Sequence, residues 1–391
     1  AGGGAATPGH PPRRRGAGLG AAGAGAAQLG GLSRRCAAPP GDRGGHWEAT
    51  ARRAAYRVVT HELAAEVAFL TRTAGRICAG DARLRDHAPW ALRAAVRELL
   101  IRVPVYRPYR TGAEEVLTEE AAAEARGTFA VPEEAAAVDV VRDLALGRLG
   151  EGPGQAAFRA RFAQTAAALR AKSVEDTAFY RYVPLLSANE VGGDPGGPAV
   201  SPEGFHAYCA RIARDWPTTG TALSTHDTKR SADVRARIAV LSECPGRWAK
   251  LLGDVARVPA PDGQLAWAAW QTAFGLGRPS EERLAGALLK AAREAGLRTG
   301  WTEQDAAYER AVADFVSEGP AGSAWHPVAE LVREVDPHVR ANVLGAALLH
   351  LTMPGVPDLY QGTEAVYEAL VDPDNRAPFR RARPDGKTAV T

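Results

Sequence analysis

Apolar side chains recur at helical spacing over most of this 391-residue chain. Two runs show the pattern most clearly, one that begins near Ala49 and one that stops at Pro104, a residue that cannot continue a helix. We expect a long amphipathic helix over each run. The periodic positions are Tyr56, Val59, Leu63, Val67 and Leu70 in the first run, and Leu92, Val96, Leu99, Leu100 and Val103 in the second.

The same periodicity predicts that most of the chain beyond residue 46 is helical. Further helices are expected over about 114–126, 133–148, 154–171, 203–214, 231–252, 264–275, 280–295, 303–318 and 325–350.

Strand signals are few. TTGTALSTHD, residues 218–227, is β-prone and precedes the helix-like SADVRARIAVL, and GVPDLYQGTE, residues 355–364, is expected to form a buried strand. A strand with polar residues at its C-terminal end and a helix after it is the unit of a (β/α)8 barrel. Two such units cannot close a barrel. The prediction is an α-rich α/β protein with the last strands of an incomplete TIM barrel and a large helical insertion subdomain.

Residues 1–46 differ from the rest of the chain, because they lack aromatic residues, valine and isoleucine and repeat Gly, Ala, Pro and Arg. Such a composition cannot bury a core. The chain begins with Ala1, and its one methionine is Met353. We expect this segment to be a disordered lead-in or a translation artefact on a truncated gene. The remainder is expected to divide into a helical subdomain, 47–215, and a C-terminal barrel portion with a further helical insertion, 216–391.

Composition excludes several classes of function. The formal net charge is +3, with arginines interspersed among acids, which argues against a nucleic-acid partner. Cys36, Cys78, Cys209 and Cys244 follow no metal-ligand spacing, which favours reduced, mostly buried thiols in a cytoplasmic protein. No apolar run approaches the roughly 20 residues of a membrane span. No residue cluster implies a metal or an organic cofactor.

The segment KSVEDTAFYRYVPLLSANEVGGDP, residues 172–195, is rich in polar and aromatic side chains without an amphipathic period. Glu175, Asp176, Glu190 and Asp194 alternate there with aromatic residues and with Asn189. Carboxylates and amides hydrogen-bond sugar hydroxyls, and aromatic faces cover the apolar side of a sugar ring. The segment therefore predicts a carbohydrate site rather than a surface helix.

Six motifs follow one another in a fixed order: KSVEDTAFYRY, LLSANEVGGDP, STHDTKR, RARI, MPGVPDLYQGTE and VDPDNR, with PVYRPYR at residues 104–110 before them. With these motifs the chain resembles, over roughly residues 50–382, the maltooligosyl trehalose synthases, a family of the α-amylase group of retaining barrel enzymes. The resemblance implies that the reducing-end α-1,4 linkage of a maltooligosaccharide is isomerised to α,α-1,1 by intramolecular transglucosylation. Retaining enzymes need two carboxyl groups about 5 to 5.5 Å apart. The amylase group adds a third carboxylate, which binds sugar hydroxyls.

The resemblance implies that Asp227 is this third carboxylate, a transition-state stabiliser, and that His226 beside it contacts the sugar. Hydrogen bonds that strengthen as positive charge develops on the sugar stabilise the transition state selectively. Judged on the residues alone, Asp227 could instead cap the helix that follows it. Lys229 and Arg230 are candidates for binding hydroxyls, and their charges are equally compatible with a structural role.

A second set of residues is implied to lie near the reducing-end glucose, where the 1-hydroxyl is selected as acceptor. That glucose must be held and water excluded while it turns, or hydrolysis competes with isomerisation. The alternative is a buried polar network that braces the fold. These candidates for substrate binding are Lys172, Glu175, Asp176, Tyr180 and Arg181.

The sequence also departs from the family. A nucleophile motif resembling R-x-D-H-x-D-G-L is missing, and so is the acid/base glutamate expected on the strand after it; RLRDHAPW at residues 83–90 lacks the required glycine and second aspartate. Tyr367 and Glu368 stand where the family has tryptophan and aspartate, and Ala232 replaces an expected glutamate.

The chain is therefore interpreted as the C-terminal portion of such an enzyme, a fragment that is inactive alone. Two alternatives stay open: a general α-glucan hydrolase or glucanotransferase of the same group, and an inactive α-glucan-binding fragment. The resemblance also implies maltooligosyl trehalose trehalohydrolase, which releases trehalose, as the functional partner in the pathway.

Overall fold

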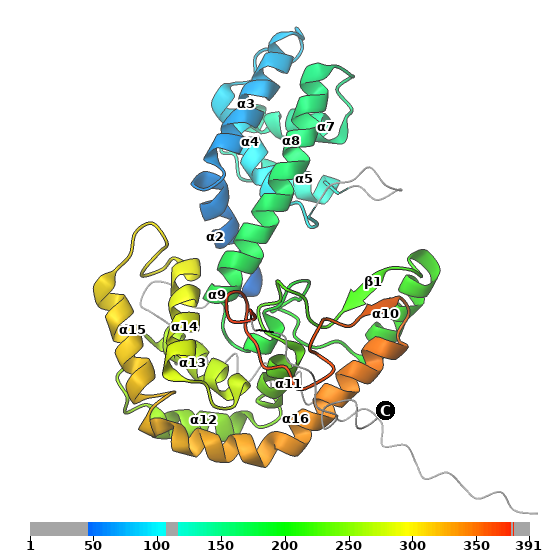
Figure 1. The fold of residues 1–391 in the computed structure, drawn as a ribbon. Coiled ribbons are helices and arrows are strands. Elements are labelled where there is room, and N and C mark those ends of the chain that lie inside the picture. The colour runs from blue at the N-terminus through cyan, green and yellow to red at the C-terminus, as the bar shows by residue number, and fades with distance from the viewer. Residues whose placement is uncertain (1–45, 107–115, 377, 379–391) are drawn as a thin grey trace, which may run out of the picture. The chain divides into compact units, whose positions relative to one another are not determined.

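The computed structural model describes residues 46–106, 116–376 and 378, which fold into two compact units. Among these residues, the helical unit comprises those up to 183 together with 288–310, and the strand unit comprises 184–287 and those from 311 onward (Figure 1). These bounds differ from the expected division at residue 215, because residues 184–215 belong with the strands and residues 288–310 with the first helices. All of the low-complexity segment 1–46 except its last residue lies outside the described residues.

The helical unit is formed by consecutive helices of 3 to 18 residues. They are α2 (Trp47–Thr60), α3 (Ala64–Ala79), α4 (Pro89–Ile101), α5 (Glu119–Arg126), α6 (Pro132–Ala135), α7 (Ala137–Leu146), α8 (Pro153–Arg170), the π-helix η1 (Ala171–Ala178) and α9 (Phe179–Arg181), with the end of α14 (Glu281–Ala295) and the start of α15 (Ala306–Glu318). The first predicted helix is found as two, because the chain turns at residues 61–63, where the Leu63 N–H donates to the Val58 carbonyl. The second is confirmed as α4.

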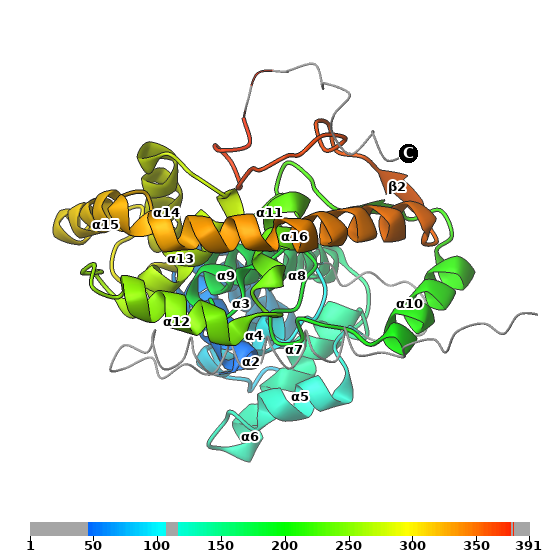
Figure 2. The same cartoon turned by 90° about the horizontal axis from the view of Figure 1, so that it is seen from below.

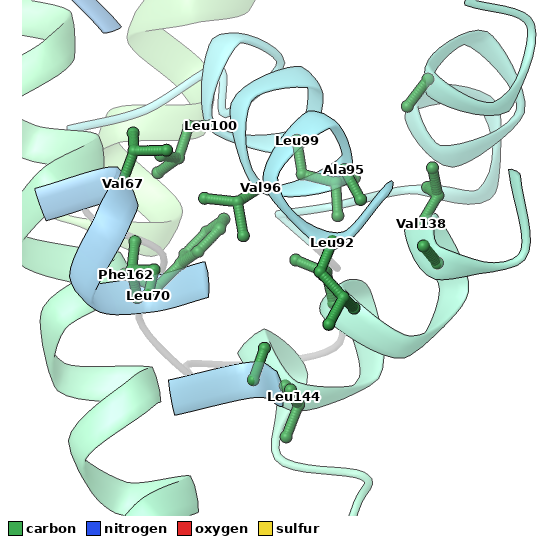
Figure 3. Close-up of a cluster of buried hydrophobic side chains, with 14 of the residues drawn as sticks. Val67, Leu70, Leu92, Ala95, Val96, Leu99, Leu100, Val138, Leu144 and Phe162 are labelled. Carbon is green, nitrogen blue, oxygen red and sulfur yellow. The ribbon is translucent and has the colours of Figure 1, made fainter. Parts of the chain in front are cut away.

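The core of the helical unit lies where α3, α4, α7 and α8 pack together. Figure 3 shows the side chains that meet there, among them Leu70, Val96, Leu144 and Phe162. These four are at most 1% exposed, and burying each is worth about 1.5 to 3 kcal/mol. The apolar positions that repeat every three to four residues thus supply the inward face of each helix.

A π-helix carries most of the KSVEDTAFYRY motif. η1 continues α8 without a break and leads into α9, and the Thr177 hydroxyl donates to the Lys172 carbonyl at 2.9 Å. The periodicity predicted no helix over residues 172–181, and the structure has two there. The wider π turn does not follow the 3.6-residue period, which explains why the pattern was missed, and π turns are frequent at functional sites.

The strand unit holds the remaining elements. They are η2 (Leu186–Ala188), α10 (Pro202–Asp215), β1 (Gly220–Ala222), α11 (Ala232–Val240), α12 (Pro245–Val255), α13 (Gly263–Leu276), η3 (Ser323–Trp325), α16 (His326–Thr352) and β2 (Val356–Asp358), with the start of α14 and the end of α15. The single helix expected over 231–252 is found as α11 and α12, because Pro245 starts a new helix at its first position.

The two expected strands pair in parallel. Gly220 is opposite Val356, and Ala222 is opposite Asp358. Parallel strands joined through helices are compatible with units of a (β/α) barrel. The expectation that the second strand is buried was wrong, since all three residues of β2 are exposed.

Helix α11 lies at the centre of the strand unit and packs against both α13 and α16. Figure 2 shows α16 running past α11 and ending at β2. Gly275 of α13 permits close packing, because a Cβ atom there would lie 2.8 Å from the Ile238 side chain. His350, near the end of α16, lies with its Nε2 2.9 Å from the carbonyl oxygen of Thr221 in β1. Strand β1 and the helix before β2 are thereby linked.

Apolar side chains are exposed at the end of α16, in β2 and on the segment that follows β2. They are Leu348, Leu349, Leu351, Val356, Leu359 and Val366, and each is at least 48% exposed. Within the part of the chain that the structure describes, no helix is both long enough and apolar enough to cross a bilayer. The same residues contain no group of three or more His, Cys, Asp or Glu side chains arranged to hold a metal ion.

Candidate functional site

The structure assembles the predicted site residues in two groups, one in each unit. In the strand unit, His226, Asp227, Lys229 and Arg230 lie between β1 and α11, on a segment that we call the Asp227 loop, residues 223–231. In the helical unit, Lys172, Glu175, Asp176, Tyr180 and Arg181 lie on η1 and α9.

The Asp227 loop follows the C-terminal end of β1, and its turn is held by threonines. The Asp227 N–H donates to Thr225 Oγ1 at 3.2 Å, and the Thr225 N–H donates to Thr228 Oγ1 at 3.3 Å. The Asp227 side chain is 57% exposed. Asp227 is not the cap of α11, because Ser231 holds that position and accepts a hydrogen bond from the Val234 N–H. The capping alternative is therefore wrong, and the carboxylate is accessible to a ligand.

Lys229 supplies positive charge beside this carboxylate. Its Nζ lies 4.0 Å from Asp227 Oδ1, and its side chain is only 4% exposed. A buried ammonium group is more costly than an exposed one unless it has compensating partners. The Lys229 side chain is therefore packed inside the loop, whereas the Asp227 carboxylate faces solvent.

A buried glutamate from the LLSANEVGGDP motif fixes the far side of the Asp227 loop. Glu190, which is 4% exposed, accepts the Lys229 N–H at 2.8 Å through Oε1 and the Arg230 N–H at 3.0 Å through Oε2. Oε1 also accepts the N–H of Val191 at 2.8 Å, and Arg235 Nε lies 3.8 Å from Oε2. Charge-assisted hydrogen bonds of this kind are roughly twice as strong as neutral ones. Glu190 thus holds the backbone two and three residues beyond Asp227.

The segment 367–375 holds the Asp227 loop from another direction. The Lys229 carbonyl accepts the Val371 N–H at 3.1 Å, and the Ser231 N–H donates to the Ala369 carbonyl at 2.8 Å. Asn375 of the VDPDNR motif donates from Nδ2 to the His226 carbonyl at 2.8 Å. The loop is therefore fixed by segments that are far away in the sequence.

The segment 367–375 is braced by its own ion pairs. Arg283 donates to both carboxylate oxygens of Asp374, at 2.6 and 2.8 Å, and Leu370 N–H donates to Asp374 Oδ2 at 2.7 Å. Burial alone would raise the pKa of Asp374, but the Arg283 and Leu370 hydrogen bonds together with the Arg283 charge hold it below its ordinary value. Glu368 pairs with Arg237 at 2.6 Å.

In the helical unit, Lys172 and Asp176 pair across one turn of η1. Lys172 Nζ donates to Asp176 Oδ2 at 2.8 Å. The hydrogen bond to Asp176 raises the pKa of Lys172, which burial opposes. The side chains of Lys172 and Asp176 are 56% and 29% exposed, so the ion pair is partly accessible to solvent.

Glu175 and Arg181 point to structural partners in the same unit. Glu175, which is buried, accepts a hydrogen bond from the hydroxyl of Tyr106 in the PVYRPYR motif. Arg181 donates from Nε to the carbonyl of Ala295 at 2.7 Å and so binds the C-terminal end of α14, where a cation is favoured. Tyr180 is partly buried on α9. Residues 107–110 of the PVYRPYR motif lie outside the described residues.

A carboxyl group that the motifs did not identify completes this group. Glu294 lies on the last turn of α14, and burial, followed by the charge of Asp176, raises its pKa above the ordinary value. An interaction with Trp301, on the loop after α14, acts in the opposite direction and lowers the pKa of Glu294. We call Lys172, Asp176, Glu294 and Trp301 the η1 cluster. Glu190 lies in the LLSANEVGGDP motif, but the sequence did not predict its contact with residues 229 and 230. Glu294 lies in none of the motifs.

Comparisons with known proteins agree on one family. No protein-family model matches the chain. A Mycobacterium tuberculosis protein named maltooligosyl trehalose synthase is 41% identical over 329 residues, which cover 81% of this chain and 40% of that protein. The chain thus spans 40% of the length of the curated relatives that it matches.

Solved structures give the same result. A mutant of maltooligosyltrehalose synthase from Arthrobacter ramosus matches with a TM-score of 0.79 and 36% identity, over 91% of this chain and 44% of that one. A Sulfolobus tokodaii structure titled as a hypothetical maltooligosyl trehalose synthase matches with a TM-score of 0.71, over 91% of this chain and 46% of that one; at 23% identity it supports the fold alone.

These matches place the chain in a class of proteins, the carbohydrate-active enzymes of the α-amylase group. Within that class, the chain belongs to the maltooligosyl trehalose synthase family.

Proposed function

We propose that the protein represented by this chain isomerises the reducing-end α-1,4 linkage of maltooligosaccharides to α,α-1,1 by intramolecular transglucosylation. The observation that carries the proposal is the Asp227 loop: an exposed carboxylate after a parallel strand, on a backbone fixed by buried and distant groups. It is supported by the 41% identity to a protein named for this activity.

Asp227 has the role of transition-state stabiliser in this proposal. Its carboxylate binds hydroxyls of the glucosyl ring in which positive charge develops, with His226 beside it on the same sugar. Because Glu190 and segment 367–375 hold the backbone around Asp227, its carboxylate needs little reorganisation when that charge appears. Lys229 and Arg230 keep the loop in shape through their backbones, and the buried Lys229 ammonium balances the charge of Asp227.

The acceptor glucose is assigned to the helical unit. Lys172, Asp176 and Tyr180 bind its hydroxyls and its ring face, while Glu175 and Arg181 position η1 through Tyr106 and Ala295. A glucose held by hydroxyl contacts can turn and present its 1-hydroxyl while water is kept away.

The proposal assigns the nucleophile and the acid/base to parts of the relatives that this chain does not span. Those parts complete the barrel to which β1 and β2 contribute, and this chain is inactive without them. The product is the substrate expected of maltooligosyl trehalose trehalohydrolase, the proposed functional partner.

The test compares the 391-residue chain with a protein extended upstream to the length of its curated relatives. With maltopentaose, the extended protein should remove reducing ends without releasing glucose, and the chain alone should do neither. Asp227→Asn in the extended protein should lower kcat by about 10²- to 10³-fold or more with little change in glucan binding.

Two outcomes would count against the proposal. Release of new reducing ends would indicate an α-glucan hydrolase, and equal losses of kcat and binding in Asp227→Asn would indicate that Asp227 has a structural role. Glu364→Gln, an exposed carboxyl change after β2, serves as the matched control and should leave both parameters unchanged.

A further inference from the structure

An exposed tryptophan stands beside the charged part of the η1 cluster. Trp301 is 52% exposed, whereas Trp248 and Trp267 are among the most deeply buried side chains of the molecule. Its loop follows the C-terminal end of α14, which contacts α9, because Arg181 Nε donates to the Ala295 carbonyl at 2.7 Å. Glu294, next to Ala295, interacts with Trp301 and with Asp176 and Lys172 of η1. Aromatic surface, carboxyl groups and an ammonium group therefore lie together within the helical unit.

The loop that carries Trp301 is rigidly built. Thr299 Oγ1 donates to Glu309 at 2.7 Å and accepts the Asp305 N–H at 3.1 Å. The Gly300 N–H donates to the Glu303 carbonyl at 3.0 Å. An aromatic side chain on a preformed loop binds a ligand without the cost of ordering that loop.

One face of Trp301 is already occupied. The guanidinium carbon of Arg293 lies 5.3 Å from the ring centroid, and Arg293 is itself fixed by two hydrogen bonds to Glu309, at 2.6 and 2.9 Å. This cation–π contact orients the indole. About half of the surface of Trp301 stays exposed beside this contact, which leaves aromatic surface on which a sugar ring could stack.

We propose that Trp301 and Glu294 form a sugar-binding surface together with Lys172 and Asp176, and that a glucose unit of an α-glucan stacks on Trp301 while its hydroxyls bond to the three charged groups. The geometry supplies the two elements of sugar recognition, an apolar platform and paired hydrogen-bonding groups at its edge. This inference rests on the proposed function for the identity of the sugar. It extends the site beyond the motif residues to the loop after α14.

The experiment titrates the 391-residue chain with maltopentaose, using calorimetry for affinity and the Trp301 indole N–H resonance, identified with Trp301→Phe, for location. We expect the resonance to shift on binding. Trp301→Ala should weaken binding by about tenfold, as expected when an aromatic anchor is truncated. Glu294→Gln should weaken it less. Trp90→Ala removes a similarly exposed tryptophan from the same unit, at 53% exposure, and should change nothing.

The inference is overturned if the chain does not bind maltopentaose, or if Trp301→Ala binds it as tightly as the parent. Binding that is insensitive to Trp301→Ala but lost in His226→Ala would refute this surface and leave the proposed function standing. Equal binding of cellopentaose through Trp301 would support the surface and contradict the α-glucan function. Should Trp301→Ala unfold, as judged by circular dichroism, Trp301→Phe decides, with an expected loss between none and about tenfold.

Discussion

The Asp227 loop and the η1 cluster are built by different means. In the loop, a buried carboxylate binds backbone N–H groups that lie 39 and 40 residues away in the sequence, and the exposed Asp227 is positioned through the main chain. In the η1 cluster, charged side chains lie beside one another on helices, with a partly buried acid among them. The first arrangement fixes geometry, and the second tunes charge. The structure of the Asp227 loop should therefore be sensitive to the loss of a hydrogen bond. The stability that the η1 cluster contributes should instead depend on pH and salt.

The largest effect is expected from Glu190→Gln. Glutamine has one acceptor oxygen, so its NH₂ group would face the N–H of either Lys229 or Arg230. A buried donor left unpaired costs about 1 to 3 kcal/mol. Chemical denaturation should show this loss, and hydrogen exchange should show faster exchange of the amides of Lys229 and Arg230.

Glu364→Gln is the control for this substitution, because Glu364 is an exposed carboxyl in the same unit. It should change neither measurement. Unchanged exchange at Lys229 and Arg230 in Glu190→Gln would mean that Glu190 does not hold the loop.

A smaller and pH-dependent effect is expected from Glu294→Gln. Burial, and then Asp176, raises the pKa of Glu294 above 4.5, so its ionised form is disfavoured in the folded state, while Lys290 and Lys172 act in the opposite direction. The stability that this acid contributes is complete below pH 4.5 and is lost as the pH rises through its raised pKa. Glu294→Gln should therefore melt about 1 to 3 °C above the parent at pH 7, and the difference should vanish below pH 4.5.

Glu303→Gln provides the comparison, since Glu303 is an exposed carboxyl on the loop that carries Trp301. It should melt with the parent at both pH values. A Glu294→Gln variant that is less stable than the parent at pH 7 would contradict the assignment of Glu294 as a charge-tuned group.

The smallest effect is expected from Lys172→Gln. Its ion pair with Asp176 is partly exposed and joins residues four apart on a helix, so it should contribute at most about 0.5 kcal/mol. High salt should reduce the difference between variant and parent in chemical denaturation. A loss of more than about 1 kcal/mol would make Lys172 a structural residue rather than an accessible charge.

Periodicity in the sequence predicted the regular part of the fold well. It located α4, α8 and α13 closely. Helices α4 and α8 bury apolar faces in the core of the helical unit, whereas α13, in the strand unit, is buried over most of its length. It failed where another constraint governs the chain. η1 has the wider π turn, and Pro245 divides one apolar run into two helices, a signal that was present in the sequence.

The candidate site was predictable only in part. The motifs made Asp227 and Lys172 candidates, because polar and aromatic side chains are concentrated in those segments, and their roles stay predictions. Glu190 contacts Lys229, 39 positions away, and Glu294 interacts with Asp176, 118 positions away. A local sequence pattern does not record interactions over such separations. The burial of β2 was predicted wrongly because its apolar composition was taken to imply neighbours.

The exposed side chains at the end of α16 and in β2 also govern how the protein behaves as a solute. Salts such as sulfate are excluded from protein surfaces and strengthen the association of apolar groups. Leu348, Leu349, Val356 and Leu359 should therefore give the chain a low salting-out point and early retention on a hydrophobic column. Replacing Leu349 and Leu359 with serine should raise that salting-out point. The solubility of the chain should therefore depend on the buffer anion, because of the exposed apolar side chains around β2.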